Sequence, residues 1–199
     1  MRSFFALVAL VSAAAAVFIP PHDIRDDNES TESIVASLTA SNHFGAPNAP
    51  QVAGATPGWY FGDDPASADG LPWLKDPDLC ASLAADPTAL HCPAGTAFRG
   101  TYYEVFYGLN ASIQAPDYMT FGLVDTVSDC ETMCDSVTGC NFINPYHDVN
   151  GKDGSPLLTC SLYSQFHTAA DADNFGGQTQ SDGSIDFITD SAGYDRTGP

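Results

Sequence analysis

The clearest periodic stretch of the chain begins at Thr101. Residues 101–107 (TYYEVFY) follow the two-residue period of a β-strand, with large apolar side chains on both faces. Further strands are predicted at 141–149, where Pro145 favours an edge or a bulge, and at 158–162. Ile185 and Phe187 mark what we take as the last strand. The pattern predicts a small antiparallel sheet.

A single helix is expected between these strands, over residues 129–137. Ser128 and Glu131 have the spacing of a capping box, in which the Ser128 hydroxyl accepts the amide hydrogen of Glu131. Gly139 suits the end of this helix. One helix packed against an antiparallel sheet predicts an α+β fold.

The N-terminal half has a different composition. Residues 17–57 hold few large apolar side chains and many of Ala, Ser, Asn, Asp and Pro, so we expect a flexible low-complexity segment there. Residues 58–100 form an irregular transitional segment, broken by Asp-Pro pairs, in which Cys80 and Cys92 are close enough for a local bridge. The compact domain is therefore expected at 101–199, after an irregular N-terminal segment.

Residues 1–16 have the pattern of a signal peptide. A short positive start is followed by an apolar run at 4–12 and by small residues at 13–16 that suit cleavage. The apolar run is shorter than the roughly 20 residues that span a bilayer. The sequence thus predicts a secreted, extracellular protein without a membrane anchor.

The charge balance limits the choice of partners. The chain has 25 acidic residues against six Lys and Arg, for a net charge of -19. This surface repels phosphate, so nucleic acid and anionic membranes are not expected partners. Solubility in an extracellular medium is the simplest interpretation of the acidity.

The cysteines predict a disulfide framework. In an oxidising compartment their spacing is not typical of zinc or of a nucleophile. On a helix, Cys130 and Cys134 lie on one face. Cys134 can reach Cys140 beyond the helix end, and Cys130 can reach Cys160 on a strand. Six cysteines allow fifteen pairings, so spacing alone leaves the connectivity open.

A motif within this framework resembles the core of PAN/Apple-like domains: Cys130-x3-Cys134-x5-Cys140, then Phe142 and Tyr146, then Cys160-Ser161-Leu162. Those domains fold as a small sheet with one helix strapped across it by two disulfides. The resemblance implies the pairs Cys130–Cys160 and Cys134–Cys140, and a role in adhesion. Apple domains also join their two ends by a bridge, and no cysteine follows Cys160 to form it.

A second resemblance covers about half the chain. Residues 101–194 are similar to the secreted fruit-body-specific proteins of mushroom-forming fungi, most plainly at 146–160 (YHDVNGKDGSPLLTC) and 176–194 (GGQTQSDGSIDFITDSAGY). Relatives often carry further cysteines late in this region, where Phe166 and Phe175 stand here. The family has no established catalytic activity. The resemblance implies a fungal extracellular protein linked to fruiting-body development.

Two stretches invite a chemical interpretation. Residues 148–154 (DVNGKDG) suggest a calcium loop, but Lys152 and Thr159 occupy positions that need oxygen and Glu ligands, so a polar turn is the better interpretation. His147 and His167, with Asp148 or Asp171, can be drawn as a base and its orienter. No hydrolase motif accompanies them. No cofactor or metal is expected.

Two sequons and one aromatic cluster complete the picture. Asn110 and Asn28 each begin an Asn-x-Ser sequon, and Asn110, just after a strand, is the better candidate for glycosylation. The densest aromatic cluster is expected to fill the core from one strand face and leaves the other face open for sugar stacking: Tyr102, Tyr103, Phe106, Tyr107. The leading hypothesis is a non-enzymatic module that binds carbohydrate or protein at the cell wall or matrix. The alternative is a secreted hydrolase around His147, Asp148 and His167.

Overall fold

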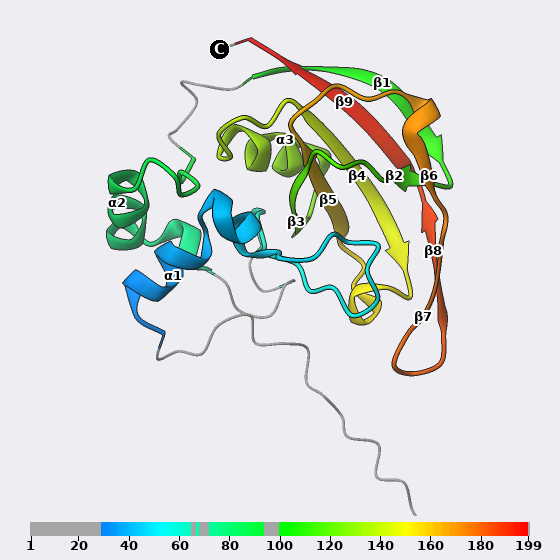
Figure 1. The fold of residues 1–199 in the computed structure, drawn as a ribbon, viewed down its shortest axis with the longest axis horizontal. Helices are drawn as coiled ribbons and strands as arrows, with labels where there is room; N and C mark the ends of the chain where they lie inside the picture. Colours follow the sequence, from blue (N-terminus) through cyan, green and yellow to red (C-terminus); the bar gives the residue numbers. More distant parts are fainter. Residues whose placement is uncertain (1–28, 65–66, 68–71, 94–99, 199) are drawn as a thin grey trace, which may run out of the picture.

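A twisted antiparallel sheet forms the centre of the molecule (Figure 1). The computed structural model describes residues 29–64, 67, 72–93 and 100–198. Five strands follow the order β1-β9-β4-β5-β3. Their bounds are Thr101–Leu109 for β1, Tyr118–Val124 for β3, Phe142–Val149 for β4, Leu158–Tyr163 for β5 and Ser191–Thr197 for β9. The expected α+β class with an antiparallel sheet is confirmed.

Four shorter strands extend or flank this sheet. β8 (Ile185–Thr189) pairs with the second half of β4 and forms a hairpin with β7 (Gly176–Thr179). β2 (Ser112–Ile113) and β6 (Ala172–Asn174) form a separate two-stranded sheet. Figure 1 shows the β7–β8 hairpin on the side of the molecule away from the N-terminal helices.

β4 is a central strand, although Pro145 predicted an edge or a bulge. β5 pairs with one side of β4, and β9 and then β8 pair with the other. Ile143 pairs with Tyr194 of β9, and His147 pairs with Thr189 of β8. Four residue steps separate the two β4 residues, whereas five separate their two partners. The extra residue makes a bulge at the β8–β9 junction, opposite Pro145. A residue without an amide hydrogen is tolerated there because the ladder is already broken.

The last strand is β9, so the expectation that Ile185 and Phe187 mark the last one is wrong. Its sequence, SAGYDRT, lacks the alternation of large apolar residues that identifies strands. It pairs with both β1 and β4, so the partners rather than the composition hold it. At Gly193 a Cβ atom would collide with the ring of Phe106, which explains a glycine in this strand.

The predicted helix is present as α3 (Val127–Asp135) and begins two residues earlier than expected. Its capping box is Thr126 with Asp129, not Ser128 with Glu131. The Thr126 hydroxyl accepts the amide of Asp129 at 3.2 Å, and the Asp129 carboxylate accepts the amide of Thr126 at 3.0 Å. Both pairs have the same spacing, and the extended backbone of Thr126 decides between them. The helix buries Cys130, Met133 and Cys134 against the sheet.

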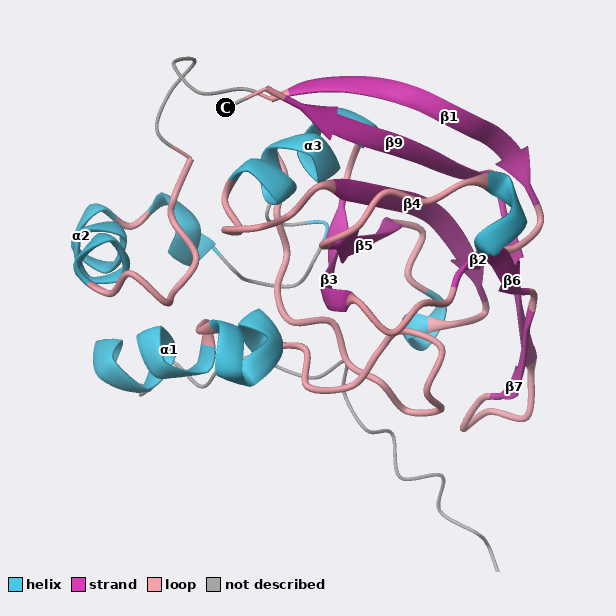
Figure 2. Ribbon diagram, turned by 45° about the horizontal axis from the view of Figure 1, so that its top comes forward, coloured by secondary structure: helices cyan, strands magenta, loops and turns pink. Residues whose placement is uncertain are grey.

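The N-terminal segment is folded, so the expectation of a flexible region is wrong for residues 29–57. It forms α1 (Thr31–Ser37) and the 3-10 helix η1 (Ala40–Gly45). Beside α1 lies α2 (Pro77–Ala85), preceded by the 3-10 turn η3 (Pro72–Lys75). The backbone amide of Leu90 donates to the carbonyl of Leu38 at 3.0 Å. A few apolar side chains of this region join the main core: Leu38, Phe44, Leu79, Leu83, Leu90. Figure 2 shows these helices together at one end of the sheet.

Residues 58–61 continue the sheet beyond β3. The backbone amide of Gly58 donates to the backbone carbonyl of Phe121 at 2.9 Å, and the amide of Leu123 donates to the carbonyl of Trp59 at 3.0 Å. The Trp59 side chain is buried in the main core. A Cβ on Gly122 would lie 2.7 Å from the Trp59 carbonyl oxygen, so a glycine lets this segment approach. The N-terminal segment is therefore anchored in the same core as the C-terminal sheet.

All six cysteines are paired, as Cys130–Cys160, Cys134–Cys140 and Cys80–Cys92. The first ties α3 to β5, the second pins the turn after α3, and the third staples α2 to the segment that follows it. The pairing implied by the PAN/Apple resemblance is the one found. Within the described ranges no helix is long and apolar enough to cross a bilayer. The expected signal peptide (1–16), residues 17–28 and Asn28 lie outside the described residues.

Candidate functional site

The three residues of the hydrolase alternative do not come together. The ring of His167 packs against Phe142 and Tyr163, with ring centroids 5.3 and 5.0 Å apart. Phe142 and His147 lie five residues apart on β4, which is about 17 Å of strand. His147 and Asp148 are neighbours whose side chains point to opposite faces of the sheet.

The partners of His167 are two carboxylates, Asp117 from the loop before β3 and Asp171 from a short 3-10 helix (Ala169–Asp171) just beyond the histidine. Its Nε2 lies 3.1 Å from Asp117 Oδ1, and its Nδ1 lies 3.6 Å from Asp171 Oδ2. Asp117 also accepts the backbone amide of Gln165 at 2.7 Å. These contacts join the loop after β5 to the loop before β3, which is a structural role for the histidine.

Asp148 is bound by a lysine from the loop that suggested calcium. Lys152 Nζ donates to Asp148 Oδ2 and to the carbonyl of Pro50, both at 2.9 Å, and lies 5.3 Å from the centroid of the Phe121 ring. Burial raises the pKa of Asp148, Lys152 opposes that rise, and the nearby Asp186 carboxylate adds to it. The ammonium group already occupies the cation position beside Asp148, so this loop is a buried ion pair that holds residue 50 against the sheet.

A cavity of about 290 Å³ lies beside the first turns of α3. Its rim combines aromatic, hydroxyl and carboxylate groups, among them Phe61, Asp63, Asp129 and Thr132. These are general features of sites for polar ligands. Of the two carboxylates that line this cavity, that of Asp129 already accepts hydrogen bonds from Thr126, and the neighbouring carboxylate of Asp125 is likewise bound within the protein.

The Tyr60 hydroxyl donates to the carboxylate of Asp125, which also accepts the amide of Asp64 at 3.0 Å and the hydroxyl of Ser67 at 2.9 Å. Burial and this hydrogen bond raise the pKa of Tyr60 to about 12. Burial opposes ionisation of Asp125, but the hydrogen bonds outweigh it and lower its pKa. Asp129 is taken up by the helix cap, and burial raises its pKa. Across the residues that the structure describes, no group of three or more His, Cys, Asp or Glu side chains is placed to hold a metal ion.

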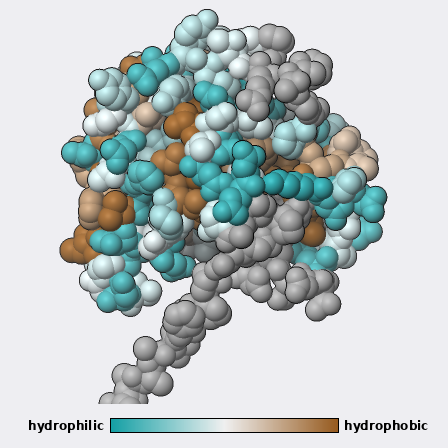
Figure 3. Space-filling view, turned by 180° about the vertical axis from the view of Figure 1, so that it is seen from behind, coloured by the Kyte–Doolittle hydropathy of each residue, from teal (hydrophilic) through white to brown (hydrophobic). Residues whose placement is uncertain are grey.

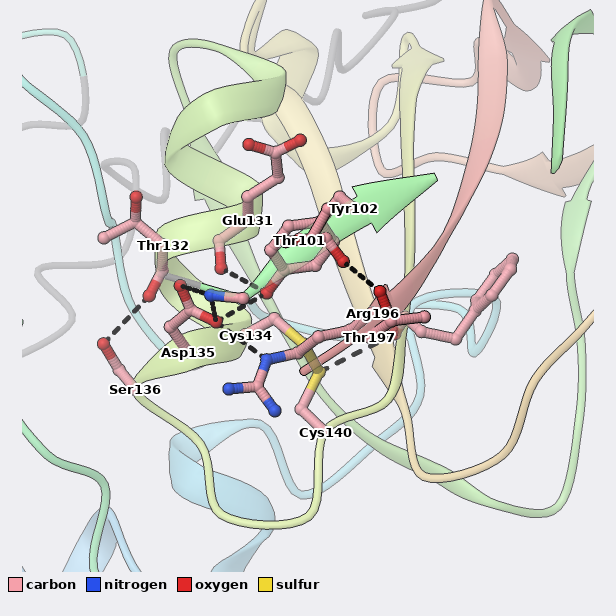
Figure 4. A network of polar contacts seen from close by, with 12 residues as sticks. Thr101, Tyr102, Glu131, Thr132, Cys134, Asp135, Ser136, Cys140, Arg196 and Thr197 are labelled. Atoms are coloured by element: carbon pink, nitrogen blue, oxygen red, sulfur yellow. Dashed lines mark hydrogen bonds and ion pairs between the residues drawn. A yellow bond between two sulfur atoms is a disulfide. The ribbon is translucent and has the colours of Figure 1, made fainter. Parts of the chain in front are cut away.

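A second polar network joins the end of α3 to β1 and β9 (Figure 4). The Asp135 carboxylate accepts Arg196 Nε at 2.8 Å and lies 2.9 Å from the Tyr102 hydroxyl, which also contacts the carbonyl of Glu131 at 2.8 Å. The amide of Gly100 donates to the same carboxylate at 3.2 Å. Burial raises the pKa of Tyr102 well above its usual range, so this hydroxyl stays protonated as a donor. The network fixes the helix, and its groups are mutually satisfied.

The carboxylates of Asp117, Asp125 and Asp135 are thus engaged within the protein, whereas a set of large hydrophobic side chains is exposed. Eight such side chains are exposed within the described residues, and all but Val52 belong to the sheet region: Tyr103, Val105, Tyr107, Phe166, Phe175, Ile185, Phe187. Seen from behind, hydrophobic side chains form patches separated by hydrophilic residues (Figure 3). Five of the seven are aromatic rings, the side-chain type that most often contributes to binding surfaces.

One group of these side chains belongs to β1. Phe106 is buried and Tyr102 is half-buried in the core, as the aromatic cluster predicted, while Tyr103 and Tyr107 are 59% and 74% exposed. β1 is the outermost strand of the main sheet, and it contains two bulges against β9. Bulges of this kind discourage further strand pairing at a sheet edge.

A second group lies on the β7–β8 hairpin, and we call Phe175, Ile185 and Phe187 the hairpin patch. Ile185 and Phe187 are two residues apart on β8 and share one face. Phe175 directly precedes β7, whose first residue Gly176 pairs with Phe187. The same hairpin and its neighbouring loop also carry amide and carboxylate side chains: Gln178, Gln180, Asp182, Asn150. The sequence marked Ile185 and Phe187 as strand residues but gave no signal that they are exposed.

Asn110 is exposed in a bend directly after β1, consistent with a surface sequon. Ser112 of the same sequon is buried in β2, and its hydroxyl accepts the side-chain amide of Asn174 at 2.9 Å. The sequence did not indicate this difference between the two ends of the sequon.

Comparisons with known proteins give no assignment: the chain matches no protein-family model, no curated protein and no solved structure. Family and function therefore rest on the cysteine motif, the fold and the exposed surface.

Proposed function

We propose that this chain is a secreted, non-enzymatic binding module of the PAN/Apple-like type that binds carbohydrate through the hairpin patch. The support for the family is a small antiparallel sheet crossed by one helix that Cys130–Cys160 ties to it, with Cys134–Cys140 closing the helix end. The resemblance of residues 146–160 and 176–194 to secreted fruit-body-specific proteins supports a fungal extracellular protein of the fruiting body.

The observation that carries the carbohydrate proposal is the exposure of Phe175, Ile185 and Phe187 beside amide side chains. A sugar ring offers a flat apolar face that stacks on an aromatic ring, while its hydroxyls pair with amide and carboxylate groups. Phe187 is 47% exposed and Phe175 is 66% exposed, which leaves both rings open to such contact. Gln178 and Gln180, on and just beyond β7, are the amide side chains that the same hairpin offers as donors and acceptors.

The charge of the chain narrows the ligand class. A net charge of -19 disfavours glycans that carry sulfate or carboxylate groups. Neutral polysaccharides and those with free amino groups remain compatible. We therefore propose a neutral or cationic wall polysaccharide as the ligand.

A protein ligand is the second candidate, and the exposed edge strand β1 favours it. An extended partner segment can add to such an edge through backbone hydrogen bonds, with side-chain pockets for specificity. The two bulges in β1 weigh against this mode because they interrupt the ladder that a partner would extend.

The test is a sedimentation assay of the purified secreted chain with insoluble chitin, chitosan and β-glucan. We expect one of them to retain the chain, and the double variant Phe175→Ala/Phe187→Ala to weaken retention by about tenfold. Phe166→Ala removes another exposed ring, outside the hairpin, and should bind like the wild type. Failure of all three polysaccharides to retain the wild type would contradict the proposal, as would unchanged binding by the double variant.

A further inference from the structure

Asn110 and Tyr107 lie close together at the end of the outermost strand. Tyr107 is 74% exposed, and Asn110 follows it by three residues. From Phe106 to Leu109 the chain advances three residues while β9 advances two, from Gly193 to Ser191. Tyr107 and Gly108 thus form a bulge, in which Gly108 has a φ of 67° that suits glycine. Even fully extended, three residues span at most about 10 Å, and the bulge shortens this distance.

We propose that Asn110 carries an N-linked glycan, attached before β2 pairs with β6, whose first sugar packs against the ring of Tyr107. This inference rests on the export of the chain, which is part of the proposed function. Tyr107 then contacts the glycan of its own chain, and the hairpin patch stays free to bind an external ligand.

The attachment uses the side-chain amide of Asn110. Its Nδ2 forms a bond to the anomeric carbon of an oligosaccharide carried on a lipid diphosphate. The bond between that carbon and the diphosphate oxygen breaks, the lipid diphosphate leaves, and the amide nitrogen gives up one proton to a base of the transferase. The lipid-linked oligosaccharide is thus the co-reactant.

The order of events follows from Ser112. A transferase that recognises Asn-x-Ser needs access to the serine hydroxyl as well as to the asparagine. In the folded chain Ser112 is 1% exposed, and its hydroxyl is bound to Asn174 of β6. The folded chain therefore presents Asn110 but hides Ser112, so the sugar must be added while residues 110–112 are still unpaired.

The position explains how the end of β1 is protected. An exposed strand edge that carries Tyr103, Val105 and Tyr107 is prone to pair with other chains. A glycan at Asn110 stands at the end of this strand, where its first sugar covers the most exposed of the three side chains. It shields an apolar edge with a hydrophilic group and adds to the protection by the bulges.

The site is tested by expressing the full chain with its own leader in a eukaryotic secretory host. We expect peptide mapping of the secreted protein to find Asn110 glycosylated, and Asn110→Gln to lose that glycan. Asn28→Gln, at the other sequon, should keep it. A secreted chain with an unmodified Asn110 would overturn this inference and leave export standing, whereas a chain retained inside the cell would overturn export itself.

The timing and the contact with Tyr107 need two further measurements. In vitro, membranes that contain the transferase and its lipid-linked donor should modify the reduced, unfolded chain and leave the folded, unglycosylated chain unmodified. Enzymatic removal of the whole glycan hydrolyses the side-chain amide and leaves an aspartate at position 110. This change is the same in every variant, and it should lower the Tm of the wild type by about 2–4 °C and that of Tyr107→Ala much less. Tyr103→Ala, another exposed tyrosine of β1, should respond like the wild type. Equal modification of folded and unfolded chain, or equal Tm losses in all three proteins, would overturn the proposal.

Discussion

Asn144 of β4 donates its side-chain amide to the hydroxyl of Ser191 at 2.9 Å, where the chain passes from β8 to β9. The same amide donates to the backbone carbonyl of Ala192 at 2.7 Å, and the side-chain oxygen Oδ1 of Asn144 accepts the backbone amide of Ile113 at 2.8 Å. One buried side chain thus joins β4, β9 and β2. It replaces backbone hydrogen bonds that the bulge opposite Pro145 interrupts.

Replacing Asn144 should therefore be costly. Asn144→Ala leaves several buried polar groups without partners, and we expect the free energy of unfolding to fall by about 2–4 kcal/mol. Urea unfolding followed by circular dichroism measures the loss. Asn48→Ala, at an exposed position, is the control and should change the stability by less than about 0.5 kcal/mol. A similar small change for Asn144→Ala would contradict the bridging role.

The two disulfides of α3 should differ in their contribution. Cys130–Cys160 closes a loop with a sequence separation of 30, whereas Cys134–Cys140 closes one of 6. Chain entropy gives about 3.5 kcal/mol for the first and about 2 kcal/mol for the second. We expect Cys130→Ala/Cys160→Ala to lose about 1.5 kcal/mol more than Cys134→Ala/Cys140→Ala in urea unfolding. All four cysteines are buried, so the two double variants are matched, and the reverse order would be evidence against this account.

Asp148 should make the stability depend on pH in an unusual direction. Burial raises its pKa in the folded chain, so the folded state binds this proton more tightly than the unfolded state, whose value is 3.8. Its ionisation therefore destabilises the fold at neutral pH, and this contribution is relieved as the pH falls through the folded pKa towards 3.8. We expect the unfolding free energy of the wild type, relative to Asp148→Asn, to rise as the pH is lowered from 7 to 4.

The control for this pH experiment is Asp153→Asn in the same loop. Asp153 is exposed, and Asn tolerates its φ of 55°, so the variant removes one negative charge without removing a buried group. If both variants gave the same dependence on pH, net charge rather than the burial of Asp148 would be the cause.

The network of Figure 4 predicts a loss at Asp135. Asp135→Asn weakens the ion pair with Arg196 and the hydrogen bond with Tyr102. The Arg196 side chain is 18% exposed. We expect a loss of about 1–3 kcal/mol in thermal or urea unfolding, below the value for fully buried ion pairs because solvent reaches part of Arg196. Asp173→Asn removes an exposed carboxylate from β6 and should have little effect. Equal losses in the two variants would show that the network contributes nothing specific.

The sequence predicted those parts of the fold in which local pattern and tertiary structure agree. The alternation at 101–107, the cysteine spacing of α3 and the apolar positions of β5 each identify an element without knowledge of its neighbours. β9 could not be found in this way because its residues are small or polar and its place depends on β1 and β4. For the same reason the few apolar residues of the N-terminal segment, such as Leu38 and Phe44, did not indicate a folded region.

The candidate site was less predictable than the fold. Period-two patterns show which residues share a strand face, but not whether another element covers that face. Tyr103 and Phe187 are therefore indistinguishable in sequence from core residues such as Phe106. Likewise, His167 and Asp148 could be named as titratable groups, but only their neighbours Asp117 and Lys152 show that each is already engaged.

The disulfides also determine how the chain responds to force. Pulling on the two ends cannot extend the segments between Cys80 and Cys92 or between Cys130 and Cys160, whose sequence separations are 12 and 30. At about 3.6 Å per residue, these loops withhold about 150 Å of contour length. When the molecule unfolds under tension, its contour length would therefore increase by less than the number of residues implies. Helix α3 would stay fastened to β5 even after the outer strands had separated.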